Sequence, residues 1–162
     1  MPKVALTDKH ISNSIEHAVR SVYKTMLRHD IKLLPSTTTI NEDRRYEVIC
    51  NVNFLGEING VVHLCLDADH AGFIASNVLG LSPLELDNDM IKDALGEITN
   101  MTTGGFKNAL CDLGYPCKLS LPTLARGHAL KVAAVKNTVR YIFDFDCEGY
   151  SIIADIQVQM EA

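Results

Sequence analysis

The longest amphipathic segment of the chain is residues 87–113, with the sequence DNDMIKDALGEITNMTTGGFKNALCDL. Apolar residues recur in it every three or four positions, which is the spacing of one face of an α-helix. Asp87 can cap its first turn, and Gly114 and Pro116 follow its last turn. The segment therefore predicts a long helix whose buried face is formed by Ile91, Ala94, Leu95, Ile98, Met101, Ala109 and Leu110.

A second amphipathic helix is predicted near the start of the chain. Apolar residues at helical spacing run through residues 11–26, and Thr7 or Asp8 can cap the first turn. The polar, threonine-rich residues 35–45 that follow are expected to form a connecting loop.

A β-hairpin is predicted between the two helices. Residues 46–54 alternate apolar and polar side chains, residues 61–66 form a second apolar run, and an Asn-Gly pair lies in the turn between them. A short helix should follow, capped by Asp67 or Asp69 and closed by Gly80.

Three further strands are predicted in the last third of the chain, at residues 129–136, 139–146 and 150–160. Helices and strands in this order predict an α+β fold, a layered domain with long helices packed on a largely antiparallel sheet. No linker or low-complexity tract divides the 162 residues, so we expect a single domain over residues 1–162.

The charge and hydropathy of the chain argue against two classes of protein. A net charge of -5 argues against a general nucleic-acid binder and against a protein that binds anionic membranes. No apolar run approaches the length of a membrane span, and the first residues lack the apolar region of a signal peptide. We therefore expect a cytoplasmic protein.

The five cysteines are odd in number and widely scattered, at Cys50, Cys65, Cys111, Cys117 and Cys147. No C-x-x-C pair and no histidine pair at zinc-ligand spacing is present, so no metal site is expected and the thiols should be reduced and mostly buried. A catalytic cysteine–histidine couple stays open as an alternative, although no local motif supports it. His63 should lie in a strand, and the other histidines should lie at the surface.

The two long predicted helices align on each other at an offset of 76 residues, and their apolar positions then coincide. Each helix is followed by strands, which is consistent with two related halves about a pseudo-two-fold axis. Any two amphipathic helices also align at some offset. At this offset Ser21 and Lys24 correspond to Glu97 and Asn100.

Glu97 and Asn100 lie one helical turn apart and off the apolar stripe of their helix. Gly96 and Gly104 share their face, so no bulky side chain covers the acid and the amide. The adjacent glycines Gly104 and Gly105 each cost about 1 kcal/mol of helix stability relative to alanine. This cost is easier to understand if close approach to the backbone is needed at that point.

An acid and an amide without a nucleophile or a metal cluster cannot carry covalent catalysis unaided. Asn100 is suited to holding a water molecule, because its carboxamide both accepts and donates hydrogen bonds. Glu97 is suited to pairing with a cation on a partner. The pair therefore fits water-assisted hydrolysis of a bond that the partner holds, with a solvated helix face as the alternative. Asp93 and Lys107, on nearby turns, are either partner contacts or solvated.

The motif Glu97-x-x-Asn100, followed by Met101-Thr-Thr-Gly104, resembles the catalytic helix of the CheC/CheX/FliY phosphatases of bacterial chemotaxis, most closely that of the CheX-like members. The resemblance extends over almost the whole chain and implies a CheC-like fold with two pseudo-symmetric halves. It also covers residues 21–26, residues 56–66, Pro122-Thr123, Gly127 and residues 130–132.

This resemblance implies a protein phosphatase, a hydrolase that acts on the aspartyl phosphate of a CheY-like response-regulator receiver domain. Asn100 would hold the attacking water, and Glu97 would pair with a lysine of the receiver. The Mg²⁺ and the phosphorylated aspartate would belong to the receiver, so no cofactor of the chain's own is expected. The same helix face is expected to contact the partner through Asp93, Gly96, Thr103, Gly104 and Lys107.

Some family members carry a second motif, and Ser21 and Lys24 occupy its place here. The resemblance therefore implies a single site per chain. It also implies a homodimer, and the long alternating strand at residues 150–160 is compatible with strand-mediated pairing. The alternative function is a non-catalytic module that binds a receiver or a motor component through the same helix face.

Overall fold

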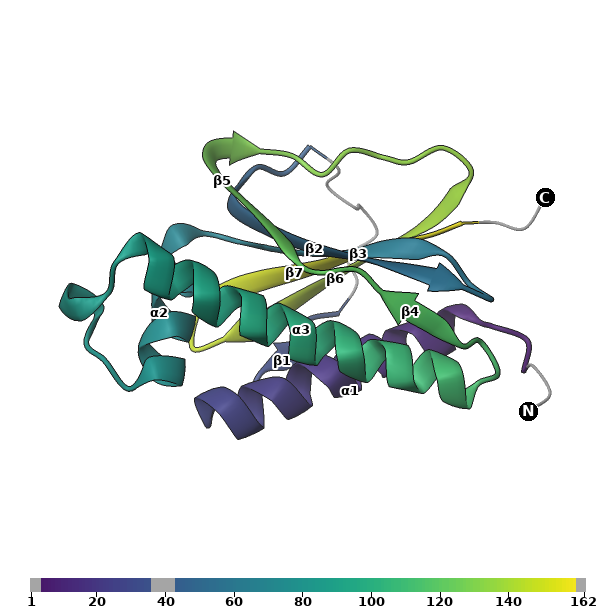
Figure 1. The fold of residues 1–162 in the computed structure, drawn as a ribbon, viewed down its shortest axis with the longest axis horizontal. Helices are drawn as coiled ribbons and strands as arrows, with labels where there is room; N and C mark the ends of the chain where they lie inside the picture. The colour runs from purple at the N-terminus through teal and green to yellow at the C-terminus, as the bar shows by residue number, and fades with distance from the viewer. Residues whose placement is uncertain (1–3, 36–42, 160–162) are drawn as a thin grey trace.

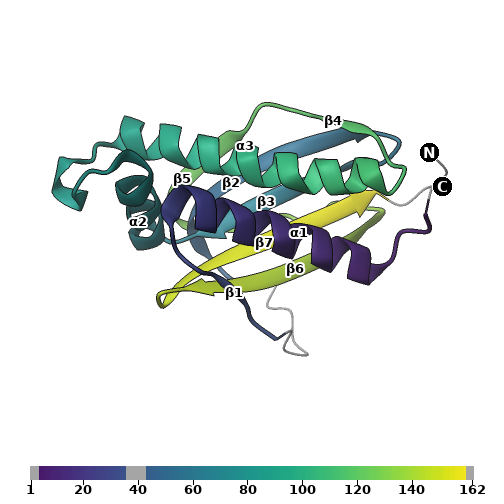
Figure 2. The same ribbon diagram turned by 90° about the horizontal axis from the view of Figure 1, so that it is seen from below.

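The computed structural model describes residues 4–35 and 43–159, which form two layers. Three α-helices pack on one face of an antiparallel sheet (Figure 1, Figure 2). The helices are α1 (Asp8–Val22), α2 (Ala68–Leu79) and α3 (Asn88–Asp112), with a π-helical turn η1 (Tyr23–Leu27) after α1 and a 3-10 turn η2 (Pro83–Glu85) before α3. The predicted α+β layered fold is confirmed. Most of the loop predicted at residues 35–45, and the last residue of the strand predicted at residues 150–160, lie outside the described residues.

Seven strands make up the described sheet: β1 (Lys32–Leu33), β2 (Tyr46–Gly56), β3 (Gly60–Leu66), β4 (Cys117–Leu119), β5 (Thr123–Leu130), β6 (Thr138–Cys147) and β7 (Tyr150–Gln159). Their order is β1-β6-β7-β3-β2-β4, and β5 pairs with the first half of β2, on the same edge as β4. Every pairing is antiparallel. The predicted hairpin is β2–β3, and the predicted strands at residues 139–146 and 150–160 correspond to β6 and β7.

The order of the strands is consistent with two related halves. Exchanging β1 with β4, β2 with β6, and β3 with β7 gives the same order read backwards. In each half a long helix, α1 or α3, precedes the strands, and the two helices lie side by side (Figure 2). The spacing is not constant, since β6 begins 92 residues after β2 whereas the helices align at 76. The halves therefore share topology but not loop lengths.

Side-chain caps determine where α1 and α3 begin. Thr7 Oγ1 accepts a hydrogen bond from the backbone N–H of His10 at 3.2 Å, and the Asp87 carboxylate accepts one from that of Met90 at 2.8 Å. Gly80 ends α2 in the left-handed conformation, with φ of 67°. The predicted caps Thr7 and Asp87 and the predicted stop at Gly80 are confirmed.

The main core lies between the helices and the sheet. Its largest fully buried apolar side chains come from both layers: Ile11, Ile15, Tyr23, Phe54, Leu66, Ile74, Ile98, Phe106, Leu110, Phe145 and Ile156. The helices α1 and α3 approach closely at Gly105, where an added Cβ would lie 3.2 Å from the Cβ of Ala18. Gly105 therefore allows the two helices to pack, which explains one of the two adjacent glycines in α3.

The strand predicted at residues 129–136 is wrong, because β5 covers only its first two residues. Residues 131–137 instead pack over the sheet face opposite the helices. Gln157 of β7 accepts a hydrogen bond from the N–H of Val135 at 2.7 Å and donates one to the carbonyl of Ala133 at 3.0 Å. A buried side chain thus satisfies backbone groups that a strand would pair with its neighbour.

The strand β7 is buried on both faces. Ile152 and Ile156 face the helices, whereas Asp155 and Gln157, polar positions of the alternating pattern, are buried on the opposite face. The Asp155 carboxylate pairs with Arg140 of β6, with 2.7 Å between Nη2 and Oδ2. In the described part of the chain, every buried side-chain nitrogen and oxygen has a hydrogen-bond partner.

The sequence predicts that His70 lies at the surface, and this prediction is wrong. His70 is buried where α2, η1 and β7 meet. Its Nδ1 donates a hydrogen bond to the carbonyl of Ser151 at 2.8 Å, and its Nε2 accepts one from the hydroxyl of Tyr23 at 2.9 Å. Burial lowers the pKa of His70, so the neutral imidazole that these two bonds require is favoured. His63 lies in β3, half-buried, as predicted.

The cysteines are free thiols, four of them buried and Cys111 partly exposed, as predicted. Burial raises the pKa of Cys147 to about 11, so this thiol is protonated at neutral pH. Within residues 4–35 and 43–159, no helix has the length and apolar character needed to cross a membrane.

Candidate functional site

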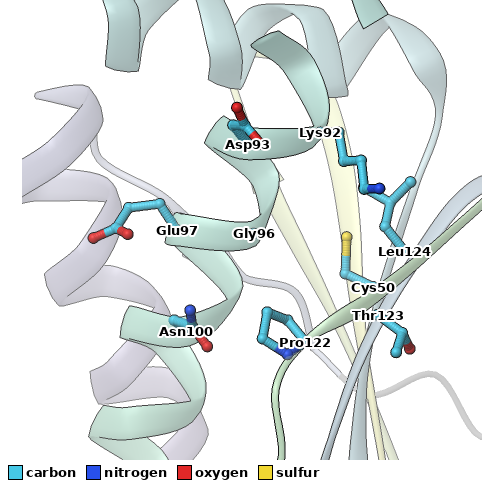
Figure 3. A pocket seen from close by; sticks show the side chains of 9 residues that line it. All are labelled: Cys50, Lys92, Asp93, Gly96, Glu97, Asn100, Pro122, Thr123 and Leu124. Atoms are coloured by element: carbon cyan, nitrogen blue, oxygen red, sulfur yellow. The ribbon is translucent and has the colours of Figure 1, made fainter. Parts of the chain in front are cut away.

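Glu97 and Asn100 project from the middle of α3, on the side away from the core. Both side chains are exposed, whereas the residues between them, Ile98 and Thr99, are buried. Figure 3 shows the two side chains leaving the helix one turn apart. The predicted exposure of this acid–amide pair is confirmed.

The pair borders a groove of about 300 Å³ between α3 and the start of β5 (Figure 3). One wall is the exposed face of α3, and the opposite wall is the segment 122–124. Figure 3 shows Pro122 beside Asn100. The groove is lined by Cys50, Lys92, Asp93, Gly96, Glu97, Asn100, Pro122, Thr123 and Leu124.

Gly96 leaves room in the groove. A Cβ added at Gly96 would meet no other atom within 4 Å, so a side chain there would occupy open space beside Glu97. Gly104 is equally unobstructed, but it does not line the groove. The lack of a side chain at Gly96 therefore gives a partner access to this face of α3.

The structure separates the other residues expected to contact a partner. Asp93 lines the groove, about one turn before Glu97. Lys107 is half-buried and lies outside the groove. Thr103 is only 1% exposed, and its hydroxyl donates a hydrogen bond to the carbonyl of Thr99 at 2.7 Å. The prediction that the Thr103 side chain contacts a partner is therefore wrong. The buried face of α3 packs on two helices and the sheet, so it is wide enough to include this position.

The far wall and the floor of the groove were not predicted as site residues. They are formed by Cys50, Pro122, Thr123 and Leu124; Lys92, on the near wall in α3, is a further lining residue that was not predicted. The available signal was the Pro122-Thr123 pair, which belongs to the family resemblance but was not assigned to the site. The far wall is tied to α3 through β5, since Arg126 Nη1 donates a hydrogen bond to Asn88 Oδ1 at 2.9 Å.

The groove offers charged and amide groups rather than a reactive thiol. Burial raises the pKa of Cys50 to about 11, an effect that a hydrogen bond with Thr99 partly offsets. The thiol is therefore protonated at neutral pH and is a poor nucleophile. No histidine is among the described residues that line the groove. The carboxylates, the lysine and the Asn100 amide are suited to binding a charged partner and orienting a water molecule.

The corresponding positions on α1 have a different local structure. Ser21 and Lys24 are exposed, but the α-helix changes into the π-helical turn η1 at Tyr23, between them. The Thr25 hydroxyl donates a hydrogen bond to the carbonyl of Ser21 at 2.8 Å. At these corresponding positions the first half of the chain therefore presents a serine and a lysine, where α3 presents an acid and an amide.

Solved structures define the class to which this fold belongs. A CheC-like superfamily protein from Shewanella sp. PV-4 has a TM-score of 0.84 at 22% identity, over 95% of this chain and 100% of that chain. CheX from Vibrio vulnificus has a TM-score of 0.80 at 24% identity, over 92% and 96% of the two chains. A chain of the CheX–CheY–BeF3–Mg²⁺ complex from Borrelia burgdorferi has a TM-score of 0.74 at 21% identity, over 93% and 98%. The protein has the fold of the CheC-like proteins.

The family within this class follows from the sequence. Residues 48–146 match the family model described as chemotaxis phosphatase CheX, and this span contains the whole groove. The chain belongs to the CheX family of chemotaxis phosphatases. Among curated proteins, none has a sequence that matches this chain.

Proposed function

We propose that this protein accelerates hydrolysis of the aspartyl phosphate on a CheY-like response-regulator receiver domain. The observation that carries the proposal is the exposed pair Glu97 and Asn100 beside an open groove, within the part of the chain that matches the CheX family. The complex from Borrelia burgdorferi, in which a similar fold occurs with CheY, BeF3 and Mg²⁺, supports a receiver domain as the partner.

In this proposal Asn100 enters the active site of the receiver and orients the attacking water. Its Oδ1 accepts a hydrogen bond from the water and its Nδ2 can donate one, as the water-positioning glutamine of some GTPases does. The water oxygen forms a bond to phosphorus while the bond from phosphorus to the aspartate oxygen breaks. The products are inorganic phosphate and the free aspartate carboxylate, and this chain forms no covalent intermediate.

The receiver supplies the Mg²⁺ and the reacting aspartate in this proposal. Glu97 pairs with a lysine of the receiver and thereby aligns α3 across its active site. Asp93, which lines the same groove one turn earlier, adds a second negative charge on this face. The location of the reaction is the cytoplasm.

The proposed activity is tested by following loss of phosphoryl label from receiver domains of the same organism. Each receiver is phosphorylated with acetyl phosphate, and its dephosphorylation is measured with and without this protein. Acceleration for at least one receiver is expected. Binding without acceleration across the whole panel would contradict the proposal and would favour the non-catalytic binding module.

Replacement of Glu97 by alanine is expected to weaken association more than turnover. The KM for the phosphorylated receiver should rise about tenfold, which corresponds to about 1.4 kcal/mol and suits the loss of one ion pair at an interface. The measurement is the dependence of the dephosphorylation rate on receiver concentration. Asp112→Ala is the matched control, because it removes one exposed carboxylate from the far end of α3. Unchanged binding and turnover in Glu97→Ala would show that the role assigned to Glu97 is wrong.

We also propose that the protein forms a homodimer through a sheet edge. The C-terminal strand β7 is not available for this pairing, because β6 and β3 flank it. The strand β6 is the alternative, since β1 pairs with it only at Phe145 and Asp146, and no other described strand pairs with its outer edge. Sedimentation equilibrium is expected to give twice the mass of the chain. A single-chain mass at all micromolar concentrations would contradict the proposal.

A further inference from the structure

The segment that enters β5 carries a leucine that is almost fully exposed. The Leu121 side chain is 86% exposed, although the backbone on either side of it is held in place. Before it, the N–H of Ser120 donates a hydrogen bond to the carbonyl of Asn53 at 2.9 Å, and Ser120 Oγ accepts one from the N–H of Asn53 at 3.0 Å. After it, the Thr123 hydroxyl donates a hydrogen bond to the side-chain oxygen of Asn51. Leu121 is therefore an exposed apolar side chain on a fixed segment.

The exposed side chain of Leu121 lies next to the groove in sequence, and this position suggests a role in partner binding. Isolated exposed leucines are common and need no explanation by themselves. Leu121, however, directly precedes the segment 122–124, which forms the groove wall opposite Asn100. A macromolecule that fills the groove while it places a reacting group against Asn100 covers this wall. A domain-sized partner would therefore also come to lie over Leu121.

We propose that Leu121 is an apolar anchor that the receiver domain buries when it presents its aspartyl phosphate to Asn100. The inference rests on the proposed function and adds to it a residue that determines partner affinity. It implies that the receiver has an apolar surface beside its phosphorylated aspartate. Because Leu121 is preceded and followed by anchored residues, it loses little conformational freedom on binding, which favours its use as an anchor.

The proposed contact of Leu121 with the receiver should affect binding of the receiver but not the rate of hydrolysis. Leu121 has no polar group and touches no reacting atom in this arrangement, so its contribution is the same before and during hydrolysis. Loss of such uniform binding raises KM and leaves kcat unchanged. Replacement of a leucine that becomes buried is expected to weaken association by about tenfold or more.

The test compares Leu121→Asp with wild type and with a control, Leu55→Asp. Leu55 is 62% exposed and lies at the end of β2, where its side chain points away from the face that carries α3, since its neighbour Phe54 packs on Phe106. The probe is a CheY-like receiver of the same organism, phosphorylated with acetyl phosphate for kinetics and loaded with BeF3 and Mg²⁺ for direct binding. We expect Leu121→Asp to raise KM and Kd at least tenfold with kcat within twofold of wild type, and Leu55→Asp to change none of them.

Several results would overturn the inference and leave the proposed phosphatase activity intact. One is a wild-type KM for Leu121→Asp in an assay in which Asn100→Ala is inactive. Another is that Leu121→Asp changes the sedimentation of the isolated chain but not the KM. That result would show that a second copy of the chain, rather than the receiver, covers Leu121. If the wild type accelerates no receiver, the binding measurement tests the role of Leu121. Equal Kd values for wild type and Leu121→Asp, or no binding by either protein, would reject Leu121 as an anchor. Weaker binding by Leu121→Asp alone supports it even then.

Discussion

Replacement of Asn100 by alanine is expected to reduce the kcat for receiver dephosphorylation by about 10²–10³-fold, the loss typical of removing one positioned hydrogen-bonding group from an active site. Alanine retains the helix but cannot accept or donate the hydrogen bonds that orient the water. Asn100 is exposed and has no described side-chain partner within the chain, so the fold and its melting temperature should be unaffected. The KM should change little, because Glu97 and the far wall of the groove are still present.

The control for this variant is Asn108→Ala. Asn108 is another exposed asparagine of α3, about two turns further on, and it does not line the groove. Its replacement changes helix propensity by the same amount as Asn100→Ala and should leave kcat unaltered. The measurement is single-turnover loss of label from a phosphorylated receiver at saturating concentration of each variant. Full activity of Asn100→Ala would disprove the proposed role of this side chain.

The helices could be predicted because their signals are local. For α3, the apolar spacing, the cap at Asp87 and the stop at Gly114 lie within the helix or next to it, and the described helix spans Asn88–Asp112. The exposed pair Glu97 and Asn100 follows from the same periodicity, since positions three apart share a helix face. Each of these features depends on residues that are near each other in the chain.

The strands before β6 were partly mispredicted because their pairing depends on distant residues. The strand β5 lies at the sheet edge and has mostly exposed side chains and an internal glycine, so it lacks an apolar alternation. The apolar run at residues 132–135 beyond it suggests a strand, but the Gln157 side chain binds its backbone instead. A hydrogen bond from a residue some twenty positions away leaves no mark in local periodicity.

The groove shows the same limit at the functional site. Its near wall, α3, could be predicted, but its far wall follows from the pairing of β5 with β2, which places Leu124 opposite Cys50. That register depends on contacts between segments more than 70 residues apart in sequence. The burial of Thr103 could not be predicted from one helix either, because it depends on how many neighbours α3 packs against.

Replacement of Asp155 by alanine is expected to lower the free energy of unfolding by about 3–5 kcal/mol, the typical cost of breaking a buried ion pair from one side. The side chains of Asp155 and Arg140 are 4% and 14% exposed, and Arg140 reaches the carboxylate through Nη2 at 2.7 Å and Nε at 3.1 Å. In the variant the guanidinium stays on a covered sheet face without this carboxylate. Chemical denaturation followed by circular dichroism measures the effect.

Asp144→Ala provides the control, because Asp144 of β6 also pairs with an arginine, Arg44, at 3.5 Å. These two side chains are 37% and 38% exposed, so the loss should stay below about 1 kcal/mol for the ion pair. Equal losses in the two variants would show that burial does not set the strength of the Asp155 pair.

Arg140 also donates a hydrogen bond to the carbonyl of Val132 at 3.5 Å. Asp155→Ala should therefore speed amide hydrogen exchange in residues 131–137. The proposed phosphatase activity of the folded fraction should be unchanged, because the groove lies across the sheet beside α3.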